Sequence, residues 1–272
     1  MKIFSIRLVS HIRCSEMIVL VISVFWSTMA SIVFLVTWYL IPQWRNLHNY
    51  ISGHQIVTGT LHLYSILINR LFFDGHNSIS IALNQYLFMI TLTWSLCASL
   101  FAYLKLVLVF IQTIPFEKAK ATIFAYGAMI TIKILTNVII PTVIPLDTVL
   151  LRMLPVMISI YMILSVNFML FACIARHVVK SCNLASRARG KRIASLVCVA
   201  ILCDFITLIY LSSIVININL LYVLKSIFYL RLIPQAIVVL FNQNSRRLWK
   251  LYFQMRRYRN IDLGIELVSQ RT

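Results

Sequence analysis

Two opposite charges lie deep inside apolar segments and are the first candidates for chemistry. Asp204 lies twelve residues before the end of Ile193–Ile216, and Arg231 lies twelve residues after the start of Asn219–Phe241. If the two segments are antiparallel helices, both charges would be about 18 Å from the same membrane surface. A charge at that depth costs about 2.5–3.5 kcal/mol on insertion scales and usually marks function. The spacing predicts an Asp204–Arg231 ion pair, with Lys133 as a competing partner and a protonated or water-facing Asp204 as the alternative.

The sequence lacks the motifs of common enzyme classes. It contains no zinc-binding His-Glu-x-x-His, no Gly-x-Ser-x-Gly, no phosphate-binding Walker loop and no close group of cysteines and histidines. The six histidines are scattered, and the six cysteines include no pair expected in outer loops. We therefore expect a protein that is not an enzyme, that has no metal or other cofactor, and that has no disulfide framework.

The composition indicates which elements must position the buried charges. Hydrophobic residues make up 61% of the 272 residues and charged residues 12%, whereas soluble domains average about 45–50% and about 25%. The apolar stretches run unbroken for about 20 residues, as membrane-spanning helices do, and lack the alternation of barrel strands. Soluble, disordered and barrel-forming chains are excluded, and most of the chain is expected to lie in lipid.

Seven apolar segments are long enough for membrane-spanning helices, although charges in three of them leave a count of six open. The segments are Met17–Ile41, Gln55–Phe73, Ile81–Phe110, Thr122–Ile144, Met153–Ala175, Ile193–Ile216 and Asn219–Phe241. We predict an all-α membrane protein, a seven-transmembrane helix bundle over residues 17–241 with a short amphipathic C-terminal helix. Residues 1–16 would form an extracellular N-terminus, and residues 242–272 would form a cytoplasmic basic tail.

The net charge of +18 is unevenly distributed along the chain. With the C-terminus inside, sixteen of the 25 Lys and Arg residues lie in inner segments and four in outer segments. The positive-inside rule favours this orientation, although three basic residues before the first span locally oppose it. Because the basic residues lie at span ends, the expected partner is a lipid bilayer and not a nucleic acid. Lys105, Lys225 and Arg70 lie near span ends and are expected to snorkel toward the membrane surface.

The start of the basic tail has the pattern of a short amphipathic helix. Four apolar residues recur at helical spacing: Leu248, Leu251, Tyr252 and Met255. Four basic residues lie among them: Arg247, Lys250, Arg256 and Arg257. Such a helix would lie on the anionic inner leaflet, where each basic residue adds about 1 kcal/mol of attraction. The alternative is a frayed tail with no fixed position.

Four short segments are similar to segments of a known receptor family. In the third span, Cys97-Ala-Ser-Leu-Phe-Ala-Tyr-Leu-Lys-Leu106 resembles Cys-Leu-Ser-Val-Phe-Tyr-Phe-Leu-Lys-Ile of the bitter taste receptors, the type 2 taste receptor family of G-protein-coupled receptors. At the end of the fifth span, Leu170-x-x-Cys173-Ile174-x-x-His177 has the spacing of that family's Leu-x-x-Ser-Leu-x-x-His. Residues 51–61 and 191–195 resemble the family's segments that enter the second and sixth spans.

The chain also departs from this family. Gln235-Ala236 stands where the family has His-Ser, and Tyr64 stands where it has Arg in the second span. Trp94 is one residue away from the Trp position that is associated with agonist contact. The stretch Arg45-Asn-Leu-His48 also suits a secretin- or methuselah-like receptor, which is the second branch within the G-protein-coupled receptors.

The resemblance implies a chemosensory receptor in the plasma membrane that detects small, bitter molecules and signals to a heterotrimeric G protein. It implies a ligand site between the outer halves of the spans, with Trp94 in contact with the small-molecule ligand. It assigns switching at the inner face to five residues: Lys105, Leu170, Cys173, Ile174 and His177. The alternative from a different functional class is a small transporter or channel subunit, which would act without a G protein.

Overall fold

The computed structural model describes residues 2–72, 78–107, 116–134, 149–180, 221–242 and 245–256, with a few isolated residues between 198 and 209. The elements of these ranges are α1 (Lys2–Leu40), the 3-10 helix η1 (Pro42–Trp44), α2 (Leu47–Phe72), α3 (Ser78–Leu106), α4 (Glu117–Ile134), α6 (Val149–Lys180), α8 (Leu221–Leu230) and α9 (Leu232–Leu240). A further helix, which we call the tail helix, covers Ser245–Arg256. The all-α class expected from the sequence is therefore confirmed over the described residues.

Three helices are long and apolar enough to cross a membrane: Ser15–Leu40 in α1, Ala82–Leu106 in α3 and Met157–Lys180 in α6. A fourth span is added if Lys225–Leu240 and the tail helix, which meet at a bend of 55°, count as one broken span. These agree with the first, third, fifth and seventh expected segments. Helices α2 and α4 cover the second and part of the fourth, and most of the sixth lies outside the described residues.

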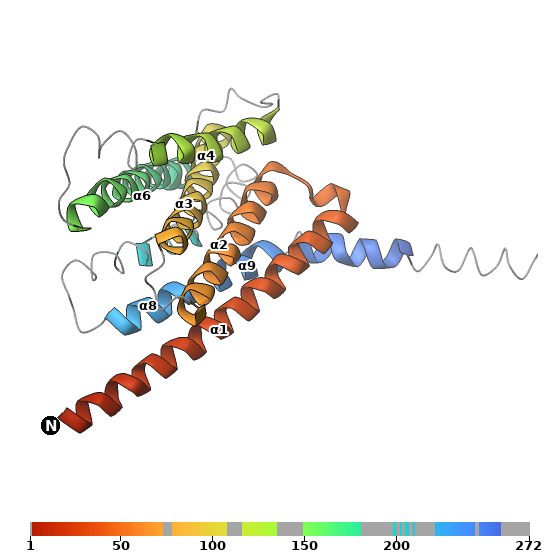
Figure 1. The fold of residues 1–272 in the computed structure, drawn as a ribbon. Helices are drawn as coiled ribbons and strands as arrows, with labels where there is room; N and C mark the ends of the chain where they lie inside the picture. The colour runs from red at the N-terminus through yellow and green to blue at the C-terminus, as the bar shows by residue number, and fades with distance from the viewer. Residues whose placement is uncertain are drawn as a thin grey trace, which may run out of the picture.

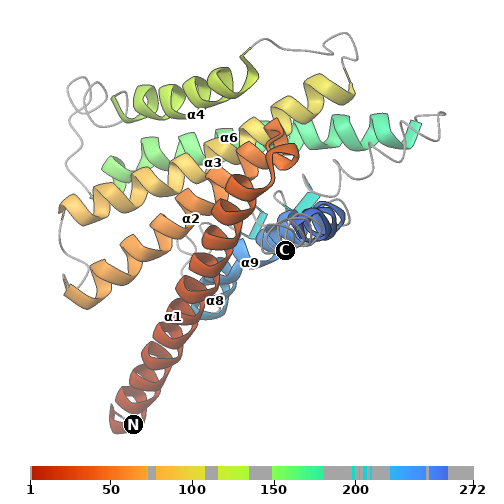
Figure 2. The same cartoon turned by 90° about the vertical axis from the view of Figure 1, so that its right-hand side faces the viewer.

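Helix α3 lies at the centre of the described bundle. It packs against α2, α4 and α6, while α1 packs against α2 and also against α8 and α9 near the other end of the chain (Figures 1 and 2). Helix α9 also contacts α2. The first and last described parts of the bundle are therefore neighbours.

One face of α1 is packed and the other is apolar but open. Leu20 and Val24 belong to the main core and are 0% and 6% exposed. Phe25, Trp26 and Leu35 are 55%, 55% and 56% exposed. A continuous apolar face of this kind is unfavourable in water but matches the acyl chains of a bilayer. The start of α1 extends beyond the other described helices (Figures 1 and 2), so residues 2–16 continue this helix and do not form a separate element.

The seventh expected segment is divided at Arg231 because of a proline one turn later. Pro234 has no N–H to donate to the carbonyl of Leu230, and its ring crowds that carbonyl. The backbone N–H of Arg231 instead donates to Phe228 O at 3.4 Å, a three-residue step in place of the four-residue step of an α-helix. Helix α8 ends at Leu230 and α9 begins at Leu232.

Candidate functional site

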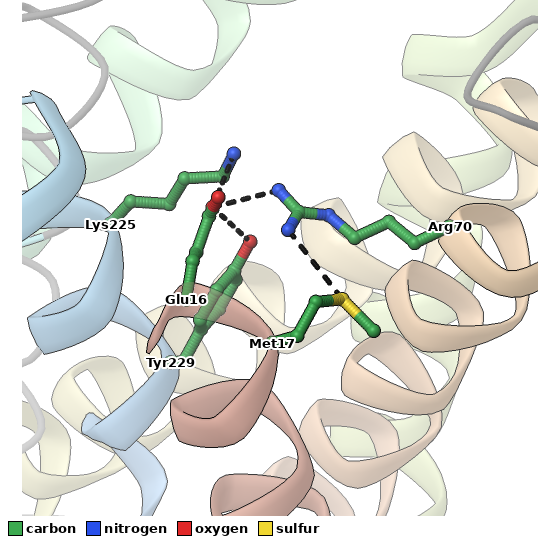
Figure 3. A network of polar contacts seen from close by, with 5 residues as sticks. All are labelled: Glu16, Met17, Arg70, Lys225 and Tyr229. Carbon is green, nitrogen blue, oxygen red and sulfur yellow. Dashed lines mark hydrogen bonds and ion pairs between the residues drawn. The ribbon is translucent and has the colours of Figure 1, made fainter. Parts of the chain in front are cut away.

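A buried carboxylate joins three helices at one end of the bundle (Figure 3). Glu16 of α1 is 4% exposed, and its Oε1 accepts hydrogen bonds from three side chains. Arg70 Nη2 of α2 lies 2.7 Å away, Lys225 Nζ of α8 lies 2.5 Å away, and the Tyr229 hydroxyl lies 3.4 Å away. All three donors reach the same carboxylate oxygen, so this one side chain ties α1, α2 and α8 together.

The helix geometry explains how these donors converge. Lys225 and Tyr229 are four residues apart on α8, so they share one face of that helix. Arg70 lies in the last turn of α2, and its Nη1 also approaches Met17 Sδ at 3.9 Å. We define these five residues as the Glu16 cluster: Glu16, Met17, Arg70, Lys225 and Tyr229 (Figure 3).

The Glu16 cluster is the main feature that sequence reasoning missed. The sequence favoured snorkelling for Arg70 and Lys225, whereas the structure pairs both with Glu16, and it also pairs Lys105 with Glu117 at 2.9 Å. A signal was present, because Glu16 directly precedes the first apolar segment while Arg70 and Lys225 lie near the matching ends of the second and seventh. The pattern gives the depth of each charge but not the sideways order of the helices, and that order decides which charges meet.

A second polar layer lies next to the Glu16 cluster. The Arg231 guanidinium carbon lies 4.0 Å from the centroid of the Phe228 ring and 5.2 Å from that of Phe88, and Arg231 is 6% exposed. The centroid of the His62 ring lies 5.3 Å from that of Phe88 and 6.1 Å from that of Phe228. These distances are typical of cation–π and aromatic contacts in an apolar interior.

The predicted Asp204–Arg231 ion pair stays a prediction. Arg231 is buried, but Asp204 lies outside the described residues. The side chain of Lys133, the competing partner, lies outside them as well, although its backbone belongs to α4.

Several buried polar atoms next to these layers have no hydrogen-bond partner among the described residues. His62 Nδ1, Ser65 Oγ and Asn69 Oδ1 recur at helical spacing along α2, and Asn84 Oδ1 lies on α3. His62 and Ser65 are only 3% and 6% exposed. Buried polar groups are nearly always hydrogen-bonded, to ordered water or a ligand where the protein supplies no partner. This face of α2 therefore carries buried polar atoms that need a hydrogen-bond partner, such as ordered water or a ligand.

Trp94, the expected ligand contact, is fully buried at 0% exposure. Its ring stacks on His54 at 4.5 Å with an interplanar angle of 11°, and the rings of Tyr50 and Tyr126 meet it edge-on at 6.1 Å and 5.7 Å. His54 and Tyr50 belong to the first turns of α2, close to the end expected to face the cytoplasm. Trp94 is therefore covered by side chains from the first turns of α2 and from α4, and its contact with a ligand stays a prediction.

The residues expected to switch at the inner face are only partly brought together. Ile174 is 0% exposed and forms a small core with Ala102 of α3 and Val178. Cys173, its neighbour in the sequence, is exposed. Leu170 and His177 are half-buried, and Lys105 reaches Glu117 of α4.

His48 lies at the same end of the bundle, before the expected second span. Burial, with a smaller contribution from nearby Lys105, lowers the pKa of His48 to about 4. His48 and Lys105 line a cavity of about 40 Å³ between α2 and α3. That volume is large enough for a water molecule, and His48 Nε2 has no partner among the described residues.

The tail helix is anchored on the turn that follows α1. The Trp44 indole N–H donates to Ser245 Oγ at 2.8 Å, and both residues are almost completely buried. Leu248 and Tyr252 pack against the core around Trp44. Leu251 and Met255 of the predicted apolar face are instead 42% and 58% exposed. The helix therefore rests its apolar side partly on the bundle, and the rest is left for lipid.

The basic residues of the tail point away from the bundle. Arg247, Lys250 and Arg256 are exposed, as expected for a helix at an anionic surface, and Arg257 lies outside the described residues. No group of three metal-ligating side chains is found within the described part of the chain.

No protein-family model matches the chain, and a comparison with curated proteins finds no similar sequence.

Proposed function

We propose that the chain is a seven-span, G-protein-coupled chemosensory receptor of the plasma membrane, similar to the type 2 taste receptors, with its N-terminus outside. The observation that carries the proposal is the arrangement of the helices. Helix α3 lies among α2, α4 and α6, while α8 and α9 return to α1, so that a polar interior lies between helices from distant parts of the sequence. A bundle of this kind can respond to a ligand by a shift between two packings of its helices.

The ligand that suits the interior is a small molecule with a polar group and an apolar or aromatic body. His62 Nδ1 and Ser65 Oγ supply hydrogen-bonding atoms without partners among the described residues. Phe88 and Phe228 supply apolar surface beside them. The tail helix and the inner ends of α3 and α6 would then form the side that meets the heterotrimeric G protein.

The first test is a calcium assay in cells that express the chain with a panel of chimeric Gα subunits and a library of small bitter compounds. We expect an agonist-dependent signal that requires the Gα chimera. Uptake or current without any Gα subunit would overturn the receptor proposal in favour of a transporter or channel subunit.

Two variants test the ligand site once an agonist is found. Ser65→Ala removes a buried hydroxyl that has no partner among the described residues, and we expect the half-effective concentration to rise about tenfold, since one such hydrogen bond contributes about 1–1.5 kcal/mol. Ser23→Ala is the matched control, because Ser23 is also fully buried but its hydroxyl donates to Val19 O of its own helix at 2.7 Å. An equal shift in both variants would place the ligand elsewhere.

The topology is tested separately by inserting glycosylation sites. Sites within residues 1–16 and in the three expected outer loops should all be modified if there are seven spans with the N-terminus outside. An unmodified N-terminal site together with a modified C-terminal site would reverse the orientation and contradict the receptor proposal.

A further inference from the structure

An apolar groove runs along the outside of the bundle between α1 and α9. Its volume is about 290 Å³, close to the lower limit of about 300 Å³ for small-molecule sites. Ala30 of α1 and Ala236 of α9 line it, and their small side chains leave space between the two helices. Ile56 of α2 and Leu232 are buried and also line the groove.

The walls of the groove offer a ligand almost no polar contact. Ser27 lines it, but the Ser27 hydroxyl already donates to Val24 O at 3.1 Å. Trp26 and Ile237 line the groove from the two helices and are 55% and 52% exposed, so the groove opens on the same apolar face of α1 that we place against lipid. A hydrocarbon chain matches this lining.

One end of the groove is followed directly by positive charge. Phe241 lines the groove at the end of α9, and the next residue, Asn242, accepts the backbone N–H of Arg246 at 3.0 Å. Arg246 and Arg247 are both exposed in the first turn of the tail helix. An apolar groove that is followed along the chain by two exposed arginines is complementary to an amphiphile with a hydrocarbon chain and an anionic head.

We propose that this groove binds an anionic phospholipid of the leaflet on which the tail helix lies, with one acyl chain between α1 and α9 and the phosphate near Arg246 and Arg247. The bilayer supplies such lipids at high local concentration, and the inner leaflet is enriched in anionic ones. Arginine binds phosphate oxygens well because its planar guanidinium offers paired donors. The proposal goes beyond receptor signalling and does not depend on it.

The test is native mass spectrometry of the full chain released from bilayers that contain equal amounts of phosphatidylserine and phosphatidylcholine. We expect the wild-type chain to retain phosphatidylserine preferentially. The preference should be about thirtyfold if each of the two arginines contributes the usual attraction of a basic residue near an anionic surface. Equal retention of the two lipids by the wild-type chain would overturn the proposal.

Variants separate the two halves of the site. Val33→Trp should fill the groove and abolish retention of both lipids, whereas Val21→Trp should change nothing. The two valines are 40% and 50% exposed on α1, and only Val33 lines the groove. Retention of phosphatidylserine by Val33→Trp at the wild-type level would refute the groove as the site.

The charge variants use two pairs of exposed residues on the tail helix. The double substitution Arg246→Gln with Arg247→Gln should remove the preference for phosphatidylserine and leave retention of phosphatidylcholine unchanged. The pair Lys250→Gln with Arg256→Gln removes the same charge farther from the groove and should keep most of the preference. Equal loss in both pairs would show a general surface attraction and overturn the specific site. A lipid-free dimer that Val33→Trp disrupts would also overturn it, because a second copy would then occupy the groove.

Discussion

Replacement of Glu16 by glutamine tests whether the Glu16 cluster holds the bundle closed. Glu16→Gln keeps the shape and one acceptor oxygen but removes the negative charge between two cations. Removal of one partner of a fully buried pair costs about 3–5 kcal/mol. The Arg70 and Lys225 side chains are 25% and 22% exposed, so solvent offsets part of that cost. We expect a loss of about 2 kcal/mol, or a decrease in Tm of about 6 °C for a chain of this size.

The matched control is Glu117→Gln, which removes the partner of Lys105. That ion pair is also short, at 2.9 Å, but the Lys105 and Glu117 side chains are 37% and 28% exposed. Pairs exposed to this degree contribute less than about 1 kcal/mol, so a decrease in Tm of at most about 3 °C is expected.

Alkylation of Cys97 at increasing temperature, quantified by peptide mass spectrometry, measures unfolding in detergent or nanodiscs. Cys97 is a free thiol at 0% exposure and should react only when the bundle opens. Cys173 is a free, exposed thiol and serves as the internal reference for reagent access. Equal midpoints for Glu16→Gln and the wild-type chain would refute the reasoning, because the buried carboxylate would then make no net contribution.

Three further predictions concern close packing, the tail helix and pH. Gly53→Ala should destabilise the protein strongly, because the new Cβ would lie 1.7 Å from the Phe34 ring. In Gly127→Ala the new Cβ meets no atom within 4 Å, so this variant should stabilise α4 by about 0.5–1 kcal/mol. Thermal unfolding measures both variants, and equal effects would contradict the packing argument. Trp44→Phe removes the N–H that holds the tail helix. The rate of tryptic cleavage within that helix should rise about fivefold, since one hydrogen bond contributes about 1 kcal/mol. Unchanged cleavage would mean that apolar packing alone anchors the tail helix. The pKa of His48 is lowered from 6.5 to about 4, so between these pH values the unfolded chain takes up a proton that the folded chain does not. The free energy of unfolding should therefore fall by about 3 kcal/mol as the pH drops from 6.5 to 4. In circular dichroism melts, the His48→Gln variant should lack this loss of stability at low pH.

The motif at the end of α6 shows what residue spacing can and cannot predict. The spacing places Cys173 and Ile174 at the end of one helix, and the structure confirms that helix. Ile174 is fully buried while Cys173 is exposed, because successive helical residues point about 100° apart and only one of them can face α3. The rotation of α6 about its axis depends on its neighbours, which the local sequence does not specify.

Trp94 shows a limit of a different kind. Its place in the third span follows from the sequence, but its contact with His54 depends on which helix lies beside α3 and at what height. The resemblance to a receptor family implies a role for that position in ligand contact. The structure covers Trp94 with aromatic side chains from α2 and α4, and the ligand contact stays a prediction.

Composition and apolar length settle that this chain is helical and suited to a membrane, because the transfer of a segment into lipid depends on a sum over its own residues. They also place the tail helix, whose pattern lies within one short stretch. Tertiary structure alone decides that Glu16 meets Arg70 and Lys225, since the energy of an ion pair depends on the distance between groups that are far apart along the chain. The same holds for the groove between α1 and α9, because its lining residues, Ala30 and Ala236 among them, come from segments far apart in the sequence.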